Sequence, residues 1–326
     1  MKLPGLRALV PLAAGAALVA GGLLLAAGEE SPAEAPYVLV LGTAQDGGIP
    51  HLGGRAEPDE AARRDRSLVR RVASLLICDP ATGGRWLVDA TPDLPEQLER
   101  AAGHPPTRRG EGERPPLLDG VLLTHAHIGH YLGLAQFGRE VYGADHLPLH
   151  VSARMAAFLA DNAPWDLLVR LGHVELVHFE PGRAIRLAPG LEAIPVPVPH
   201  RDEYSDTVGF EIRGPSRSLF YLPDIDKWER WEAPIEQVVA RVDVALLDGT
   251  FYGEGELPGR SMSTVPHPLI TESIARFAKL PAEQRARIRF THLNHTNPAA
   301  LPGTPERRAV EAAGMSIAED GDRIDL

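Results

Sequence analysis

The stretch THAHIGHYLGL, residues 124–134, places three histidines within six positions, directly after the apolar run at 121–123. His125 and His127 stand two residues apart at the end of a predicted strand, so their side chains point to the same side. His130 follows at the start of a predicted helix, where its imidazole can turn back over the same position. Neutral imidazole is a common metal ligand, and three of them nearly complete the coordination shell of zinc. The stretch therefore predicts a metal-binding turn at a strand end.

Further polar residues stand at the ends of other apolar segments. Each follows a predicted buried strand, and each is of a type that ligates metals. Layered folds often carry their functional side chains where strands end and loops begin. We therefore expect these residues to approach the three histidines in space. They are His200, Asp224, Asp248 and His292.

The remaining sequence predicts a layered α/β domain, because many apolar strands alternate with a few helices. No Rossmann glycine fingerprint is present. Uninterrupted apolar runs predict the individual strands, and apolar residues at helical spacing predict the helices. Strands are predicted at 37–44, 73–79, 85–91, 117–124, 242–251 and 287–290, and helices at 92–103, 129–143 and 268–280.

Three segments of the second half carry more specific expectations. The stretches at 206–213 and 218–224 are joined by GPSR and predict a hairpin. Three prolines in the strand at 191–200 restrict it to a sheet edge or to an irregular path. The tail predicts a helix over residues 305–313 and a small hairpin around residues 320–321.

Composition limits the classes of protein that fit. Of the 326 residues, 44% are hydrophobic and 24% are charged, which is typical of a globular chain with a sizeable core. The net charge of −11, spread along the chain, disfavours nucleic acid as a partner. The single cysteine, Cys78, lies in SLLICD and is predicted to be a buried core residue. One cysteine excludes both a disulfide within the chain and a CxxC metal or redox site.

The N-terminus predicts export. Basic residues precede an uncharged run at 8–28, which is about as long as a membrane-spanning helix and is flanked by two glutamates. We interpret residues 1–28 as a signal peptide or an N-terminal membrane anchor, 29–36 as a linker and 37–326 as one folded domain. The basic flank favours a cytoplasmic N-terminus with the domain exported, periplasmic or extracellular. The sequence leaves open whether the segment is cleaved or tethers the chain to the membrane.

At this point the pattern resembles the metallo-β-lactamase superfamily, whose signature is H-x-H-x-D-H followed by distant His, Asp and His ligands. Within that superfamily it is most similar to the pyrroloquinoline quinone biosynthesis protein B branch. The likeness rests on LGTAQDGGIPH at 41–51, LLDGTF at 246–251 and HLNHTNP at 292–298. The resemblance implies an α/β fold, an αββα four-layer sandwich with metals at one edge of its sheets.

The resemblance also implies roles for particular residues. His125, His127 and His200 match the three-histidine site, and His130 with His292 matches the second site. Asp224 matches the bridging carboxylate, with a role in acid–base catalysis. Asp89 matches a structural aspartate near the metals. Two alternatives stay open: Asp226 in place of Asp224, and His295 in place of His292.

One position departs from the superfamily pattern. Gly129 stands where H-x-H-x-D-H has its aspartate, a ligand of the second metal. We therefore expect one strong metal site and one weak or empty one, unless Asp46 or His51 in the loop after the first strand compensates. The other interpretation of Asp46 is an Asp-Gly turn. His267 is either a substrate contact or an ordinary loop histidine.

The expected function is metal-dependent hydrolysis of a small-molecule ester, amide, lactam or phosphoester by metal-activated water. One or two zinc ions per chain are the expected cofactor. The alternatives are a non-haem-iron oxygenase related to the quinone biosynthesis branch and a catalytically silent metal-binding relative. Substrate specificity is expected to lie in the loops at 47–70 and 252–268, whose composition does not name a substrate.

Overall fold

The computed structural model describes residues 34–105 and 116–326. The predicted hydrophobic segment at 8–28 lies outside the described residues. Among the helices of the described part, none is both long enough and apolar enough to span a bilayer.

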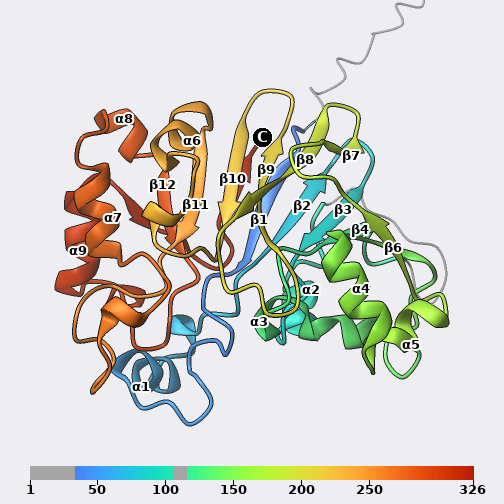
Figure 1. The fold of residues 1–326 in the computed structure, drawn as a ribbon, viewed down its shortest axis with the longest axis horizontal. Coiled ribbons are helices and arrows are strands. Elements are labelled where there is room, and N and C mark those ends of the chain that lie inside the picture. The colour runs from blue at the N-terminus through green and yellow to red at the C-terminus, as the bar shows by residue number, and fades with distance from the viewer. Residues whose placement is uncertain (1–33, 106–115) are drawn as a thin grey trace, which may run out of the picture. The chain divides into compact units, whose positions relative to one another are not determined.

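Two seven-stranded mixed sheets form the centre of residues 34–326 (Figure 1). The first has the strand order β14-β1-β2-β3-β4-β5-β6, and the second has the order β13-β12-β11-β10-β9-β8-β7. The strands of the first sheet are β1 (Tyr37–Gly42), β2 (Ser74–Asp79), β3 (Gly84–Val88), β4 (Gly120–Leu122), β5 (Leu147–Val151), β6 (Val174–His178) and β14 (Arg323–Asp325). Those of the second are β7 (Ile185–Ala188), β8 (Leu191–Val198), β9 (Thr207–Arg213), β10 (Ser218–Leu222), β11 (Val244–Asp248), β12 (Ile288–Thr291) and β13 (Ser316–Ile317).

Helices cover the outer faces of both sheets (Figure 1). The α-helices are α1 (Glu57–Arg64), α2 (Leu94–Arg100), α3 (Ile128–Tyr131), α4 (Ala153–Asp161), α5 (Trp165–Arg170), α6 (Ile235–Arg241), α7 (Ile270–Phe277), α8 (Ala282–Arg285) and α9 (Pro305–Ala312). The 3₁₀ turns are η1 (Arg66–Leu68), η2 (Leu132–Phe137), η3 (Trp228–Arg230), η4 (Met262–Thr264) and η5 (Pro298–Ala300).

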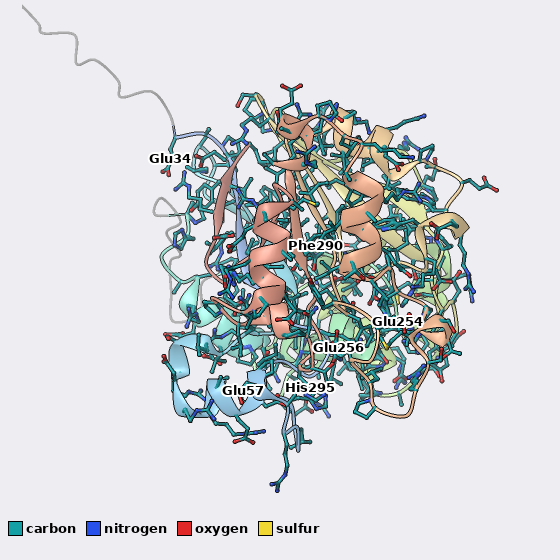
Figure 2. The ribbon with its side chains drawn as sticks, turned by 90° about the vertical axis from the view of Figure 1, so that its left-hand side faces the viewer. Glu34, Glu57, Glu254, Glu256, Phe290 and His295 are labelled. Atoms are coloured by element: carbon teal, nitrogen blue, oxygen red, sulfur yellow. The ribbon has the colours of Figure 1, made fainter. Side chains whose placement is uncertain are left out.

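Three apolar clusters account for the layers. Alternate residues of a strand face opposite sides of its sheet, so Val38 and Val40 of β1 pack between the sheets with residues such as Phe210. The outer face of the first sheet packs against α2, α4 and α5. The outer face of the second packs against α6, α7 and α9, with Phe290 of β12 beneath these helices (Figure 2). The predicted αββα four-layer α/β fold is confirmed. Cys78 is buried in the core, as predicted.

The predicted hairpin in the tail is wrong. The strands on either side of residues 320–321 join different sheets, because β13 pairs with β12 and β14 pairs with β1. The Asp320 carboxylate accepts hydrogen bonds from the Thr43 hydroxyl, at 2.7 Å, and from the Arg71 backbone amide, at 2.8 Å. These long-range bonds hold the turn beside the end of β1 and direct the last strand to the first sheet.

Two further segments differ from the local pattern. The helix expected at 129–143 ends after one turn of α3 and continues as η2, because Gly133 donates its backbone N–H to Ala90 instead of continuing an α-helix. A Cβ on Gly133 would lie 2.1 Å from the Thr91 carbonyl oxygen, so this close approach needs glycine. Strand β8 lies second from the edge of its sheet, but β7 pairs with it only over residues 191–193. Its two prolines lie beyond that pairing, where no ladder donor is needed on that side.

Candidate metal centre

The predicted ligand residues converge at one edge of the two sheets. They come from the ends of strands in both sheets, where the polypeptide leaves the apolar layer. From the first sheet, Asp46 follows β1 and the histidines at 125–130 follow β4. From the second sheet, His200, Asp224 and His292 follow β8, β10 and β12.

Two groups of ligand-type side chains form within this cluster. His125, His127, His200 and Asp224 each place one ligand atom so that all four lie within 4.8 Å of one another. A second group meets the same limit and consists of Asp46, His130 and His292. The structure therefore brings together all six predicted metal residues, and Asp46 as well.

Asp224, a member of the first group, also contacts members of the second. Its Oδ1 atom is 3.4 Å from Nε2 of His200 and 3.3 Å from Nδ1 of His267. Its Oδ2 atom faces three further imidazoles, with Nε2 at 3.3 Å in His125, 3.3 Å in His130 and 3.5 Å in His292. A carboxylate that touches members of both groups has the placement expected of a bridging ligand.

The inward-facing atoms of the cluster fit a bound cation. In native structures, buried polar atoms are normally hydrogen-bonded, so buried atoms without a partner need an explanation. Among the described residues, several buried atoms here have no hydrogen-bond partner, and nearly all face Asp224. They are Nε2 of His125, His130, His200 and His292, Oδ1 of Asp224 and Oδ1 of Asp46. Imidazole nitrogens and carboxylate oxygens form a donor set that suits zinc.

On the first sheet, Asp89 orients two of these histidines. It is fully buried and accepts the Nδ1–H of His130 at 2.8 Å. It also accepts the hydroxyl hydrogen of Thr124, whose oxygen is thus left to accept the Nδ1–H of His125 at 3.0 Å. With Nδ1 held in this way, both imidazoles direct Nε2 toward the cluster. Asp89 adopts φ 66°, an unusual backbone conformation for a non-glycine residue, as is often seen at functional sites.

On the second sheet, Asp248 orients two histidines in the same way, one directly and one through a threonine. It accepts the Nδ1–H of His267 at 2.8 Å and the hydroxyl hydrogen of Thr250 at 2.7 Å. The Thr250 oxygen in turn accepts the Nδ1–H of His292 at 2.9 Å. Asp248 also accepts the backbone amides of Ile225 and Thr250, so both its oxygens are engaged. Although it clusters with Asp224 and His267, its bonds make it an orienting residue rather than a ligand.

His267 lies inside the cluster rather than at its mouth. Its side chain is buried, and its ring is 5.3 Å from that of His200. Burial lowers its pKa, but Asp248 and then Asp224 outweigh this effect and raise the pKa of His267 to about 9. His267 is therefore placed to hold Asp224 through Oδ1, the oxygen that also faces His200.

The electrostatics of the cluster centre on Asp224. Burial would raise the pKa of Asp224, but the surrounding imidazoles, His292 first, hold it well below its usual range. Burial lowers the pKa of His125, and His130 lowers it further. For His130, burial acts in the same direction, but the Asp89 and Asp224 carboxylates outweigh it and raise its pKa to about 10. The cluster thus keeps Asp224 anionic in a buried site where a cation would be attracted.

His127 is the most accessible histidine of the first group. Its Nε2 lies 3.0 Å from the carboxylate of Glu203, which leaves Nδ1 as the atom available to a metal. The Arg201 guanidinium lies 3.4 Å from that Nδ1. Both residues belong to the loop after His200, so this loop borders the cluster.

The remaining candidates lie outside the two groups. Nδ1 of His295 pairs with the buried carboxylate of Asp59 at 2.7 Å, and the His295 ring stacks on His51 at 4.4 Å. In Figure 2, His295 lies near Glu57 and Glu256. Asp226 contacts Nδ1 of His200 at 3.3 Å, on the far side of that ring from Asp224. The structure therefore favours Asp224 over Asp226 and His292 over His295 as members of the centre.

Sequence reasoning missed four residues that shape the site: Thr124, Thr250, Arg201 and Glu203. The two threonines had a local signal, because each stands next to a ligand or to its orienting aspartate. Thr124 directly precedes His125, and Thr250 follows Asp248 by two residues. Arg201 and Glu203 had no such signal, since only the folding of their loop brings them to His127.

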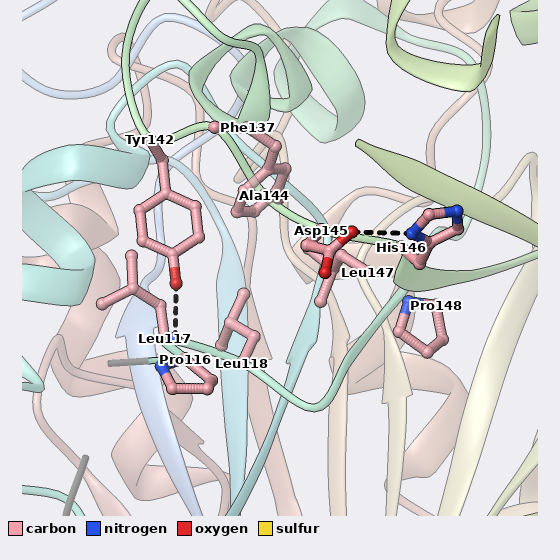
Figure 3. A pocket seen from close by; sticks show the side chains of 11 residues that line it. Pro116, Leu117, Leu118, Phe137, Tyr142, Ala144, Asp145, His146, Leu147 and Pro148 are labelled. Carbon is pink, nitrogen blue, oxygen red and sulfur yellow. Dashed lines mark hydrogen bonds and ion pairs between the residues drawn. The ribbon is translucent and has the colours of Figure 1, made fainter. Parts of the chain in front are cut away.

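A separate pocket of about 400 Å³ lies where β4 and β5 begin, at the ends of these strands that point away from the metal centre (Figure 3). The residues at 116–118 precede β4, whereas the histidine turn follows it. The pocket contains the hydroxyl of Tyr142, which accepts the Leu117 backbone amide, and an Asp145–His146 pair at 2.7 Å. It holds none of the candidate ligands.

Residues 84–293 match the family described as the "Beta-lactamase superfamily domain". The chain is 33% identical over 306 residues to "Coenzyme PQQ synthesis protein B" of Methylobacterium nodulans, covering 87% of this chain and 97% of the relative. It is 30% identical to the protein of the same name from Methylorubrum populi, over 89% of this chain and 100% of the relative.

Solved structures show the same fold. The Zn(2+)-bound PqqB from Methylobacterium extorquens superposes with a TM-score of 0.74 at 25% identity, covering 89% of this chain and 100% of the other. A diphosphatase described as belonging to the PhnP family superposes with a TM-score of 0.63 at 22% identity, covering 89% of this chain and 97% of the other. The second likeness concerns the fold alone.

Proposed function

The chain belongs to the beta-lactamase superfamily, in the family of coenzyme PQQ synthesis protein B, and from this membership and its site we propose that it is a zinc-dependent hydrolase. The observation that carries the proposal is the arrangement of the buried imidazoles. The outer nitrogens of His125, His130 and His292 are anchored to an aspartate or a threonine, while their inner nitrogens face Asp224 without hydrogen-bond partners among the described residues. That arrangement supports a site built for a cation.

The residues that would hold zinc are those of the first group, His125, His127, His200 and Asp224. A zinc ion held mainly by neutral imidazoles supplies Lewis acidity and lowers the pKa of water toward neutrality. Asp224 orients the attacking water and accepts its proton. His267, held by Asp248 at 2.8 Å, fixes the position of the Asp224 carboxylate.

We expect the purified full-length chain to contain one or two zinc ions and to hydrolyse at least one activated ester, lactam or phosphoester. Elemental mass spectrometry without added metal measures the first quantity, and a panel of chromogenic substrates measures the second. Stoichiometric zinc without turnover on any of them would favour the catalytically silent alternative. Stoichiometric iron would favour the oxygenase, and failure to bind any added metal would refute the metal centre.

The surroundings of the centre support a substrate with an apolar group. Ile128, between two predicted ligands, is 56% exposed, and Tyr204, four residues after His200, is 62% exposed. The Tyr204 ring stacks on Phe158 at 5.2 Å, which holds it in place beside the Glu203–His127 contact. Exposed apolar side chains on ligand-bearing loops are candidate contacts for a bound molecule. We propose that the apolar part of the substrate packs there.

Replacing Tyr204 by serine tests this surface. We expect Tyr204→Ser to raise KM about tenfold for substrates that carry an apolar group, because about 1.5 kcal/mol of apolar burial is lost. The value of kcat should stay within about twofold, since Tyr204 does not touch the reacting atoms. Leu171→Ser, an exposed apolar position just after α5, is the matched control and should leave both constants unchanged. An unchanged KM in Tyr204→Ser would contradict the proposed contact.

A further inference from the structure

We infer that Asp46, in the loop after β1, supplies the second-site carboxylate ligand that the superfamily motif places at position 129. The second group, Asp46, His130 and His292, would then be a complete metal subsite that shares Asp224 with the first. This inference rests on the proposed metal centre, and it replaces the expectation of a weak or empty second site.

The space around Gly129 carries the inference. A Cβ built on Gly129 would lie 2.2 Å from Oδ1 of Asp46, 2.7 Å from its Cα and 3.1 Å from its Cγ. The carboxylate of Asp46 therefore occupies the volume into which an aspartate side chain at 129 would extend. The position of the Asp46 carboxylate therefore requires glycine at 129, because a side chain at 129 would displace the one at 46.

Asp46 stands in a turn that the Gly48 N–H closes on the Gln45 carbonyl at 2.8 Å, but its Oδ1 atom takes no part in that turn. Its Oδ1 atom is buried and has no hydrogen-bond partner among the described residues, whereas an Asp-Gly turn would use the side chain to bind nearby backbone amides. Oδ1 lies 3.9 Å from Nε2 of His130, too far for a hydrogen bond and suited to two ligands of one ion. Nδ1 of His130 and Nδ1 of His292 are engaged by Asp89 and Thr250, so both rings direct Nε2 inward.

The backbone holds the Asp46 loop against another ligand loop. Gln45 donates its N–H to the Leu293 carbonyl at 2.9 Å, and Leu293 donates to the Thr43 carbonyl at 2.8 Å. The side chains of Gln45 and Asn294 are also hydrogen-bonded. The residues next to Asp46 and His292 in the chain, Gln45 and Leu293, are therefore hydrogen-bonded directly to each other. This coupling fixes the distance between the two ligands even though they are far apart in sequence.

Two substitutions test the inference by independent routes. Asp46→Asn keeps the shape of the side chain and removes its charge. Gly129→Ala adds one methyl group where the Asp46 carboxylate lies. We expect wild type to bind two zinc ions and both variants to lose affinity for one of them by about 100-fold, while the other ion stays bound. Zinc stoichiometry by elemental mass spectrometry and titration against a chromophoric chelator measure this without reference to activity.

The controls are chosen to match each change. Asp161→Asn removes the charge of an exposed carboxylate at the end of α4, and Gly103→Ala adds a methyl group where no heavy atom lies within 4 Å. Both should bind zinc as wild type does. Thermal unfolding checks that the variants fold. If Gly129→Ala does not fold, zinc binding by Asp46→Asn alone tests the inference.

The inference is overturned if wild type binds a single zinc ion, or if Asp46→Asn keeps wild-type stoichiometry and affinity. It stands if Asp46→Asn loses one ion while the wild type proves inactive on every substrate tested, because the failure would then concern the hydrolase proposal alone. A wild type that binds no metal overturns both.

Discussion

The His125→Ala variant is expected to purify without stoichiometric metal in the first group and to lose hydrolytic activity by about 10³-fold or more. Lewis-acid stabilisation by a metal contributes several kcal/mol to the transition state, and each 1.36 kcal/mol corresponds to about tenfold in rate. His125 is 1% exposed, and its Nε2 lies 3.3 Å from Asp224. No other described side chain is placed to substitute for it, because its neighbours are themselves predicted ligands.

The matched control is His178→Ala, at the exposed end of β6 and outside both ligand groups. That variant should keep its metal and its activity. Elemental mass spectrometry and kcat/KM on the best substrate of the panel give the two readouts. If His125→Ala retained stoichiometric metal, the three-histidine site would be wrongly assigned.

The Asp224→Asn variant is expected to show the second large loss, about 10³-fold in kcat/KM. The substitution is nearly isosteric, so it removes the charge while keeping the shape. Asp224 touches five imidazoles at 3.3–3.5 Å. Its loss would weaken metal binding in both groups and remove the acceptor for the proton of the attacking water.

Asp226→Asn is the control, because the sequence left these two aspartates as alternatives. Asp226 contacts the outer nitrogen of His200 and pairs with Arg230 at 2.7 Å, so its role is to orient a ligand. Residues of that kind typically contribute about 10- to 100-fold. A larger loss in Asp226→Asn than in Asp224→Asn would reverse the assignment of the bridging carboxylate.

Local periodicity predicted much of the fold. The hairpin of β9 and β10, the antiparallel pair β2 and β3, and the helix α7 all follow from patterns within about fifteen residues. The sequence pattern predicts no elements for the stretch at 144–190, although it forms β5, α4, α5, β6 and β7. Its strands are mostly half-buried, so they lack the long apolar runs that marked the others.

Within the site, the sequence alone determined which residue types stand at strand ends and that the histidine turn belongs to a layered α/β fold. These properties depend on neighbours in the chain, and local spacing reports them directly. The tertiary structure decided that Asp224 lies at the centre and Asp226 does not, and that His295 pairs with Asp59 instead of joining His292. It also decided that the carboxylate of Asp46 lies where a side chain at 129 would extend, 83 positions further along the chain. The physical reason is that such contacts depend on how closely two backbones pack, and spacing along the chain carries no information about that distance.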